Sequence, residues 1–342
     1  MKIGILSSGG DCPGINATIR GVGKTALMHY GMEVVGIHNG FSGILSDNPE
    51  DVEPLTERQL SGILNLGGTI LGTSREKNFR DLIKSEREEP DSSVIRERYQ
   101  ALGLDCLACI GGNGTQKTTY LLSTLGLNVI GIPKTIDNDV WGTDFTFGFD
   151  TAVNIATEAI DRLHTTAGSH RRVMVVEVMG HRAGWLALYA GMAGGADVIL
   201  LPELGFDINR VAEVLLEREQ VGKPYSIVVV AEGLKTPAGG KRPSDYIARK
   251  IQELTRIETR ETVLGYIQRG GSPSPFDRNL ATRLGGHATE LIAAGKFGRM
   301  VCVKGEEVDS IPLSEVAGRL KLVTPGHDLI VQGLRMGISF GH

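Results

Sequence analysis

Short apolar runs alternate along this chain with longer amphipathic segments, and this alternation is the feature that most restricts the fold. Apolar runs of strand length lie at 2–8, 33–40, 106–112, 128–133, 172–180, 197–203, 225–233 and 262–271. Helical patterns lie between several of them, over 151–167, 208–220 and 243–255. Strands that are separated by helices form mainly parallel sheets with helices on both faces. The sequence therefore predicts an α/β fold.

The length and composition fit a globular protein with two lobes. A chain of 342 residues is long for one domain, and 41% apolar and 22% charged residues are ordinary values. The net charge of −4 and the aromatic content of 5% argue against a nucleic-acid partner. Residues 1–10 are typical of a strand and a loop rather than a signal peptide, and no apolar run has the length of a membrane span.

Four cysteines, at positions 12, 106, 109 and 302, lack the spacing of a disulfide framework. Cys106 and Cys109 fall within one predicted strand, where residues three apart face opposite sides of the sheet. We therefore expect neither a metal site nor a redox pair there. Reduced thiols of this kind indicate a cytoplasmic protein.

Glycine and polar residues gather directly after the predicted strands, which is where ligands bind in parallel sheets. Residues 7–16 (SSGGDCPGIN) and 111–115 (GGNGT) each join a strand to a helix through paired glycines. Such turns bring backbone N–H groups to a phosphate, although a tight turn alone also requires glycine. Two such turns favour shared phosphate binding. By contrast, GVGKT at 21–25 lacks the first glycine of a P-loop and lies in a predicted helix.

The segment 133–139 (PKTIDND) places charge at the end of another predicted strand. Phosphoryl transfer to an alcohol needs a carboxylate that accepts the hydroxyl proton and cations that neutralise the phosphate. Asp137 and Asp139 can supply a base and a Mg²⁺ ligand, and Lys134 can bind a phosphate. Helix capping is the commoner role of such aspartates, and only the glycine turns favour the catalytic interpretation.

Arginines and glutamates near the later strands are candidate ligands for a sugar phosphate. Arg172, Arg260 and Arg269 carry guanidinium forks that suit phosphate, although a surface ion pair is the commoner role of any one arginine. Glu177 lies in a predicted buried strand and therefore needs a partner or a role. Glu232, at a strand end, can accept hydrogen bonds from sugar hydroxyls.

Together these segments closely resemble the 6-phosphofructokinase family from residue 2 to about residue 305. The shared motifs, in chain order, are SGGDCPGINATIRG, LGTSR, GGNGT, PKTIDND, FGFDTA, EAIDRL, SHRR, VEVMG, AGG, AEG and LGYIQRGGSPSPFDR. The resemblance implies two Rossmann-like lobes, an active site in the cleft between them, and a homotetramer or homodimer. It assigns 1–148 plus about 267–317 to the phosphoryl-donor lobe, and 149–266 plus about 318–342 to the sugar-phosphate lobe.

Matching positions imply a role for each site residue in transferring a phosphoryl group to the 1-hydroxyl of fructose 6-phosphate. The catalytic set is Asp137 as general base, Thr135 at the transferred group, and Lys134. The expected Mg²⁺ ligands are Asn113 and Asp139. The donor site is expected to contain Gly10, Arg75, Gly112, Asn113, Gly114 and Thr115. The sugar phosphate is expected to contact Thr135, Asp137, Arg172, Met179, Gly180, His181, Glu232, Arg260, Tyr266 and Arg269, with Arg172 and Arg260 reaching it from a neighbouring subunit.

Several positions depart from the family pattern. Asn113 replaces an aspartate, which weakens the attraction for a metal ion but keeps one ligand oxygen. His181 stands where relatives often have arginine, and the adjacent Arg182 is a candidate replacement for that cation. Leu66 and His164 replace effector-binding arginines, so we do not expect the usual control by ADP and phosphoenolpyruvate.

Two family positions distinguish ATP from pyrophosphate as the phosphoryl donor. Two small residues leave room for ATP, whereas an aspartate followed by a lysine accompanies pyrophosphate. This chain combines Gly114 with Lys134. Because Gly114 leaves the path of the nucleotide open, we expect ATP. A reversible, pyrophosphate-dependent phosphotransferase and a non-catalytic sensor of sugar phosphate or nucleotide are the competing interpretations, and sedoheptulose 7-phosphate is an alternative sugar.

Overall fold

The computed structural model describes residues 1–74, 92–237 and 242–342, and the chain divides into two compact units. Unit 1 comprises Met1–Thr135, Val140–Asp150 and Arg269–Leu320, and unit 2 comprises Ile136–Asp139, Thr151–Gln268 and Lys321–His342. The family resemblance assigns residues 136–139 to the first lobe, whereas here these four residues pack with unit 2. The functional role of each unit stays a prediction at this point.

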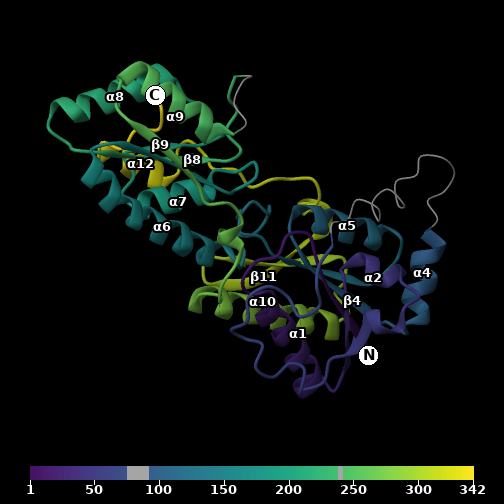
Figure 1. The fold of residues 1–342 in the computed structure, drawn as a ribbon. Coiled ribbons are helices and arrows are strands. Elements are labelled where there is room, and N and C mark those ends of the chain that lie inside the picture. Colours follow the sequence, from purple (N-terminus) through teal and green to yellow (C-terminus); the bar gives the residue numbers. More distant parts are fainter. Residues whose placement is uncertain (75–91, 238–241) are drawn as a thin grey trace. The chain divides into compact units, whose positions relative to one another are not determined.

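Unit 1 is built on a seven-stranded sheet of order β11-β10-β5-β4-β1-β2-β3. Strands β4 and β11 of this sheet are labelled in Figure 1. Its strands are β1 (Lys2–Ser8), β2 (Glu33–Ile37), β3 (Val52–Pro54), β4 (Cys106–Gly111), β5 (Val129–Pro133), β10 (Arg299–Lys304) and β11 (Glu307–Pro312). Neighbouring strands from β10 to β2 are parallel, whereas β3 and β11 pair antiparallel at the two edges. The sequence did not predict β3, β10 or β11. Strand β3 is only three residues long and β11 has one buried residue, whereas the buried strand β10 was missed in spite of its apolar residues.

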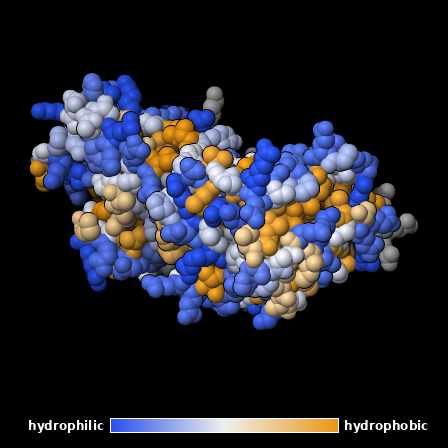
Figure 2. Space-filling view, turned by 90° about the horizontal axis from the view of Figure 1, so that it is seen from below, coloured by the Kyte–Doolittle hydropathy of each residue, from blue (hydrophilic) through white to orange (hydrophobic). Residues whose placement is uncertain are grey.

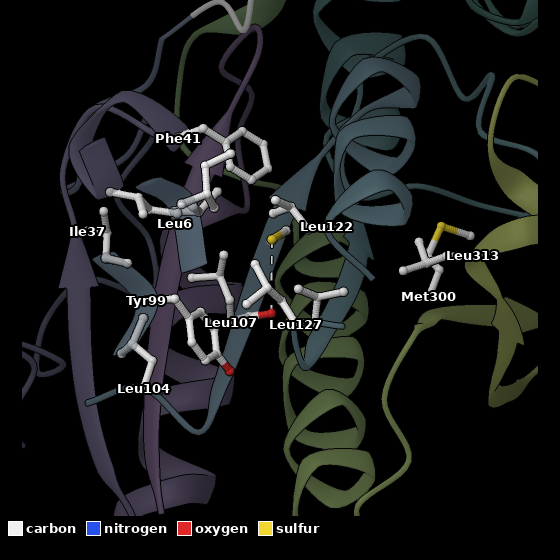
Figure 3. Packing of buried hydrophobic residues seen from close by; sticks show 14 of the residues in the cluster. Leu6, Ile37, Phe41, Tyr99, Leu104, Leu107, Leu122, Leu127, Met300 and Leu313 are labelled. Carbon is white, nitrogen blue, oxygen red and sulfur yellow. Dashed lines mark hydrogen bonds between the residues drawn. The ribbon is translucent and has the colours of Figure 1, made fainter. Parts of the chain in front are cut away.

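Helices cover both faces of this sheet. They are α1 (Ile15–Tyr30), α2 (Phe41–Leu45), α4 (Ser92–Ala101), α5 (Asn113–Thr124), α10 (Pro275–Ala293) and α11 (Leu313–Val316), with a short 3₁₀ helix η1 (Pro49–Asp51). Figure 3 shows the core on one face, where Leu6 of β1 and Leu107 of β4 pack with Leu122 of α5. The alternate side chains Ile5 and Ala108 are also fully buried, because strand residues point in turn to opposite faces.

The glycines of GVGKT serve helix packing inside α1. A Cβ atom on Gly21 would lie 2.8 Å from the carbonyl oxygen of Thr282 in α10, and one on Gly23 would lie 2.5 Å from a methyl group of Leu60. From the other helix, a Cβ atom on Gly285 would lie 2.7 Å from the carbonyl oxygen of Thr18. Helices α1 and α10 therefore touch backbone to backbone. The segment is helical as the sequence predicted, and its P-loop likeness has a packing explanation.

Unit 2 contains a four-stranded, fully parallel sheet of order β7-β8-β6-β9. Its strands are β6 (Val173–Val178), β7 (Val198–Leu200), β8 (Ser226–Ala231) and β9 (Thr259–Val263). Its helices are α6 (Phe149–His170), of which the first two residues belong to unit 1, α7 (Trp185–Ala193), α8 (Ile208–Gln220), α9 (Pro243–Thr255) and α12 (Asp328–Arg335). Valines 175, 228 and 230 form the centre of a core with α8 and α9.

Comparison with the sequence confirms the α/β class, the mainly parallel sheets and the three predicted helices of unit 2. The strand predicted over 262–271 is wrong, since β9 ends at Val263 and a 3₁₀ helix η2 follows at Gly265–Arg269. Gly265 adopts a left-handed conformation with φ of 56°, which a continuing strand does not contain. Apolar residues in this segment therefore belong to a turn rather than to the sheet.

The face in Figure 2 is largely hydrophilic, with several apolar patches among the polar side chains. Partial exposure of apolar side chains is ordinary in folded proteins. Within the part of the chain that the structure describes, no helix combines the length and apolar character needed to cross a bilayer.

Helix packing through glycine leads to the first prediction. We expect Gly285→Ala to lower the free energy of unfolding by about 1–3 kcal/mol, because the new methyl group meets backbone atoms that must move apart. The adjacent Gly286→Ala is the matched control, since its Cβ atom would lie 3.6 Å from the nearest atom, a side-chain oxygen of Thr25. That variant gains helix propensity and is expected to be neutral or stabilising by up to ~1 kcal/mol. Urea unfolding measures the free energy of unfolding of both variants. Equal values would contradict the close contact between α1 and α10.

Candidate active site

The carboxyl ends of β1, β4 and β5 meet at one edge of the unit 1 sheet. In the register of these parallel strands, Ser8 lies beside Gly111, and Gly111 lies beside Pro133. The polar segments that follow, Gly9–Gly10, Gly112–Thr115 and Lys134, therefore start from neighbouring positions. The sheet thus assembles three of the segments that the sequence singled out.

Lys134 is a buried cation at this edge, with 2% of its surface exposed. Its ammonium group donates hydrogen bonds to the carbonyl oxygen of Ser8, at 3.2 Å, and to that of Gly10. Its backbone N–H donates to the carbonyl oxygen of Gly111 at 3.0 Å. A buried ammonium group is tolerated only with such acceptors. Lys134 therefore fixes the glycine turn after β1 to the end of β5.

The first glycine turn is held from several directions. Gly9 has a left-handed conformation with φ of 84°, and its N–H donates to the carbonyl oxygen of Ser74 at 3.1 Å. The hydroxyl of Thr73 donates to the carbonyl oxygen of Gly9 at 2.8 Å. The LGTSR motif thus supports the SSGG motif in space. Arg75, the last residue of LGTSR and a predicted donor-site residue, lies outside the described residues.

The second glycine turn begins α5. Gly112 precedes the helix without a side-chain cap, and Gly114 is exposed in its first turn. Thr115 is buried and donates its hydroxyl hydrogen to the carbonyl oxygen of Ser8 at 3.3 Å. A Cβ atom on Gly111 would lie 2.1 Å from that hydroxyl oxygen, so glycine is required there. The amino end of a helix carries a partial positive charge that favours phosphate.

Arg269 lies against the first glycine turn, within unit 1. Its Nη1 atom donates to the carbonyl oxygen of Asp11 at 3.1 Å, and a Cβ atom on Gly10 would lie 2.2 Å from the same nitrogen. Gly10 therefore leaves the space that the guanidinium group occupies. The sequence placed Arg269 with the sugar phosphate, and it gave no indication that this arginine also contacts the first glycine turn.

The segment Ile136–Asp139 packs within unit 2 and contains both candidate aspartates. Asp139 is 4% exposed, and Asn138 between the two aspartates has a left-handed conformation with φ of 51°. The next helix, α6, begins only at Phe149. Neither aspartate therefore lies at the start of the next helix, where a capping residue of that helix would stand. On the unit 1 side, the carbonyl oxygen of Thr135 accepts a hydrogen bond from the hydroxyl of Thr146 at 2.8 Å.

In unit 2 the predicted sugar-binding loop follows β6, and Glu232 follows the adjacent β8. One carboxylate oxygen of Glu232 accepts hydrogen bonds from the backbone N–H groups of Gly180, at 3.2 Å, and His181, at 2.8 Å. Gln268, which is fully buried, accepts from the N–H of Met179 at 3.3 Å. These two side chains therefore fix the loop at 179–181. Sequence reasoning missed the role of Gln268, and only its place inside the IQRGG motif could have suggested it.

Arg172 and Arg260 lie near the opposite, amino end of the unit 2 strands. Arg172 directly precedes β6, and Arg260 pairs in register with Met174. Both form ion pairs with one carboxylate oxygen of Glu258, at 3.3 Å from Arg172 and 2.7 Å from Arg260. Glu258 thus gathers two guanidinium groups. Unit 2 by itself does not bring them to the loop at 179–181.

The remaining predicted residues of unit 2 are partly exposed and partly buried. His181 and Arg182 are both exposed after β6, and Tyr266 is 75% exposed on η2. Glu177 is buried and accepts a hydrogen bond from the N–H of Ser244 at 3.0 Å, in the first turn of α9. That contact supplies the partner that a carboxylate inside a strand requires.

His164 has both ring nitrogens within hydrogen-bonding distance of unit 2 partners. Its Nε2 atom lies 2.7 Å from the carbonyl oxygen of Gly194, and its Nδ1 atom lies 3.0 Å from the hydroxyl of Tyr225. Since a carbonyl oxygen only accepts, Nε2 carries the hydrogen in this arrangement. His164 therefore connects α6 to the end of α7 and to the residue before β8, which is a structural role.

Comparisons with known proteins agree with this architecture. The model of the family described as Phosphofructokinase matches residues 2–292. The ATP-dependent 6-phosphofructokinase 3 of Bacteroides thetaiotaomicron is 65% identical, over 100% of both chains. The solved phosphofructokinase of Saccharomyces cerevisiae superposes with a TM-score of 0.82 and 30% identity over 92% of this chain, which spans 45% of that longer chain. The pyrophosphate-dependent phosphofructokinase of Marinobacter aquaeolei gives a TM-score of 0.83 at 25% identity, over 100% of this chain and 93% of the other.

Burial of Cys12 behind the first glycine turn suppresses its reactivity. Burial is the main cause that raises the pKa of its thiol, from 9.0 to about 12, against the opposing effect of Lys134. Asp277 raises this pKa further, and Arg269 lowers it. Only the thiolate is a good nucleophile, so this thiol is inert near neutral pH.

We therefore predict that iodoacetamide at pH 8.5 leaves Cys12 unmodified in the folded protein. Mass spectrometry after short exposure should find no adduct on Cys12, Cys106, Cys109 or Cys302, which are all buried and are not joined by disulfides. The same treatment in denaturant serves as the control and should modify all four. Rapid labelling of Cys12 in the folded protein would contradict both its burial and its raised pKa.

Proposed function

The chain belongs to the phosphofructokinase family, and from this premise we propose that it is an ATP-dependent 6-phosphofructokinase of glycolysis. It transfers the γ-phosphoryl group of ATP to the 1-hydroxyl of fructose 6-phosphate and forms fructose 1,6-bisphosphate and ADP. The observation that carries the proposal is the register of β1, β4 and β5, which gathers two glycine turns and Lys134 at one sheet edge. That arrangement suits a polyphosphate donor.

Asp137 is the proposed general base. As the sugar oxygen bonds to the γ-phosphorus, the bond from phosphorus to the bridging oxygen of ADP breaks, and the hydroxyl proton passes to the Asp137 carboxylate. Thr135 contacts the transferred group. The buried, left-handed Asn138 between the two aspartates fixes the path of the backbone around them.

The donor site consists of Gly10, Gly112, Asn113, Gly114 and Thr115, with Arg75 as a further member. Positive charge on this side comes from the amino end of α5 and from Lys134. Lys134 supports the donor turn through the carbonyl oxygens of Ser8 and Gly10. The same lysine is proposed to contact the phosphate.

Asn113 and Asp139 are the proposed Mg²⁺ ligands. In the described ranges, no group of three Asp, Glu, His or Cys side chains forms a protein-only metal site. Magnesium in phosphoryl transfer usually takes one or two protein oxygens and completes its shell with phosphates and water, and amide and carboxylate oxygens are chemically suited to it. When bound, the ion neutralises charge on the phosphate oxygens.

The sugar-phosphate site is proposed at the loop of unit 2 and its arginines. Met179, Gly180, His181 and Glu232 contact the sugar, and Tyr266 and Arg269 its 6-phosphate. Arg172 and Arg260 lie at the other end of the unit 2 strands, which supports their contribution from a neighbouring subunit. This requires an oligomer, and we propose a homotetramer, with a homodimer as the alternative. Four free cysteines support a cytoplasmic location.

ATP is the proposed donor for two reasons. The relative that is 65% identical over its whole length is named ATP-dependent, whereas the pyrophosphate-dependent structure is only 25% identical. In addition, Gly114 leaves an exposed, side-chain-free position in the first turn of α5. The ammonium of Lys134 donates to two backbone carbonyl oxygens, so its presence also has a structural explanation.

A comparison of donors tests this choice. With Mg²⁺ and fructose 6-phosphate present, we expect turnover with ATP and at least about tenfold lower kcat/KM with pyrophosphate, a difference of ~1.4 kcal/mol in transition-state stabilisation. A coupled aldolase assay, which monitors the formation of fructose 1,6-bisphosphate, measures the rate with each donor. Turnover with pyrophosphate and none with ATP would establish the reversible phosphotransferase instead.

Replacement of the base tests the mechanism. Asp137→Asn keeps the size of the side chain but cannot accept the proton, so kcat should fall by roughly 10²–10⁴-fold. The control is Asp161→Asn, which removes the same charge from the exposed surface of α6 and should leave kcat within about twofold. Unchanged turnover of Asp137→Asn would refute the base assignment. Absence of turnover in the unmodified protein, with sugar-phosphate binding retained, would identify a sensor.

A further inference from the structure

Lys321, from the C-terminal part of unit 2, contacts the turn that carries both aspartates. The backbone N–H of Lys321 donates to the carbonyl oxygen of Asp139 at 2.8 Å. The ammonium group of Lys321 donates to the side-chain oxygen of Asn138 at 2.9 Å. One residue, distant in sequence, therefore contacts the backbone and the side chain of this turn at the same time.

The segment 321–323 is anchored on its other side to the start of α7. The indole N–H of Trp185 donates to the carbonyl oxygen of Lys321 at 2.8 Å. The Lys321 ammonium lies 5.3 Å from the centre of the Trp185 ring, within the range of a cation–π interaction. One oxygen of Glu203 accepts hydrogen bonds from the N–H groups of Val323, at 3.0 Å, and Gly184, at 2.8 Å. These contacts fix the backbone of this segment and restrict where the ammonium group that donates to Asn138 can lie.

The conformation of Asn138 requires such support. It is 2% exposed and left-handed at φ of 51°, a region that residues other than glycine seldom adopt. Asparagine tolerates this region better than most residues, but local strain persists only where surrounding contacts maintain it. Because Asn138 connects Asp137 to Asp139, a change in its backbone angles would reorient both carboxylates.

We propose that Lys321 is a positioning residue for phosphoryl transfer, which holds the Asp137–Asp139 turn through Asn138. The proposal rests on the proposed role of Asp137 as the base. A hydrogen bond from an ammonium group is stronger than one between neutral groups, and the Trp185 ring restricts where that group can lie. Lys321 thereby links the aspartate turn to α7, which directly follows the loop at 179–184.

The first test is Lys321→Met, which keeps the length of the side chain and removes the ammonium. We expect kcat to fall by about 10–100-fold, with KM for fructose 6-phosphate and ATP within about threefold, because misplacement of a catalytic group acts mainly on the chemical step. The matched control is Arg319→Met, which removes one charge and one cation–π contact, to Trp141, two residues earlier. That control should retain kcat within about twofold. Equal kcat values for the two variants would overturn the proposal.

A double-mutant cycle separates positioning from general destabilisation. Asn138→Gly removes the side-chain partner but accommodates the left-handed backbone. If Lys321 acts through Asn138, the two losses should not multiply. The kcat of the double variant should then lie within about threefold of the kcat of the slower single variant. Independent effects, in which the fold-losses multiply, would overturn the proposal. If Lys321→Met does not fold, Lys321→Arg with Asn138→Gly completes the same cycle, since arginine keeps the charge but changes its geometry.

Two further readouts distinguish the possible failures. Thermal unfolding of each variant, monitored by circular dichroism, gives the fraction of folded protein at the assay temperature. A loss of kcat that is explained by a loss of folded protein would overturn the proposal. If Asp137→Asn abolishes turnover while Lys321→Met is fully active, the proposed function stands and only this inference fails. If Asp137→Asn is fully active, the proposed function itself fails.

Discussion

The parallel register of β1, β4 and β5 is the constraint on which the candidate site of unit 1 depends. Because Ser8, Gly111 and Pro133 lie side by side, whatever follows each strand must share the same small region. Steric conditions then decide which residues fit there. Glycine is required at position 111 beside Thr115, and at position 10 it leaves the space that the guanidinium group of Arg269 occupies. The buried ammonium of Lys134 donates to the carbonyl oxygens of Ser8 and Gly10, and its backbone N–H donates to that of Gly111, so this residue connects the ends of β1 and β4. The chemistry of this region therefore follows from strand order and from the absence of side chains at two positions.

Unit 2 uses the same arrangement with a different kind of support. Its loop after β6 is fixed by side chains rather than by glycine alone, since Glu232 and Gln268 accept hydrogen bonds from three consecutive backbone N–H groups. The aspartate turn is fixed by Lys321, which approaches from the C-terminal part of the chain. In both cases polar side chains outside the reacting set hold the backbone of residues that are proposed to react. Such supporting contacts determine how precisely a catalytic group is placed.

Much of the fold could be read from the sequence. Strong apolar runs such as 2–8 and 106–112 became strands, and the helical patterns at 208–220 and 243–255 became α8 and α9 at the predicted bounds. The failure at 262–271 has a local cause, because the left-handed Gly265 ends the strand where apolar residues continue. The edge strands β3 and β11 were not predicted because β3 has only three residues and β11 has a single buried one.

The sequence by itself determined the α/β class, the family and the segments that carry charge after strands, because hydrophobic periodicity and short motifs are local properties. Tertiary structure alone decided which distant residues support those segments. Neither the contact of Arg269 with the glycine turn after β1 nor the approach of Lys321 to Asn138, 183 positions away, has a local pattern. Both contacts join segments that are far apart in the sequence. They depend on the packing of the whole unit, which neighbouring residues in the sequence do not determine.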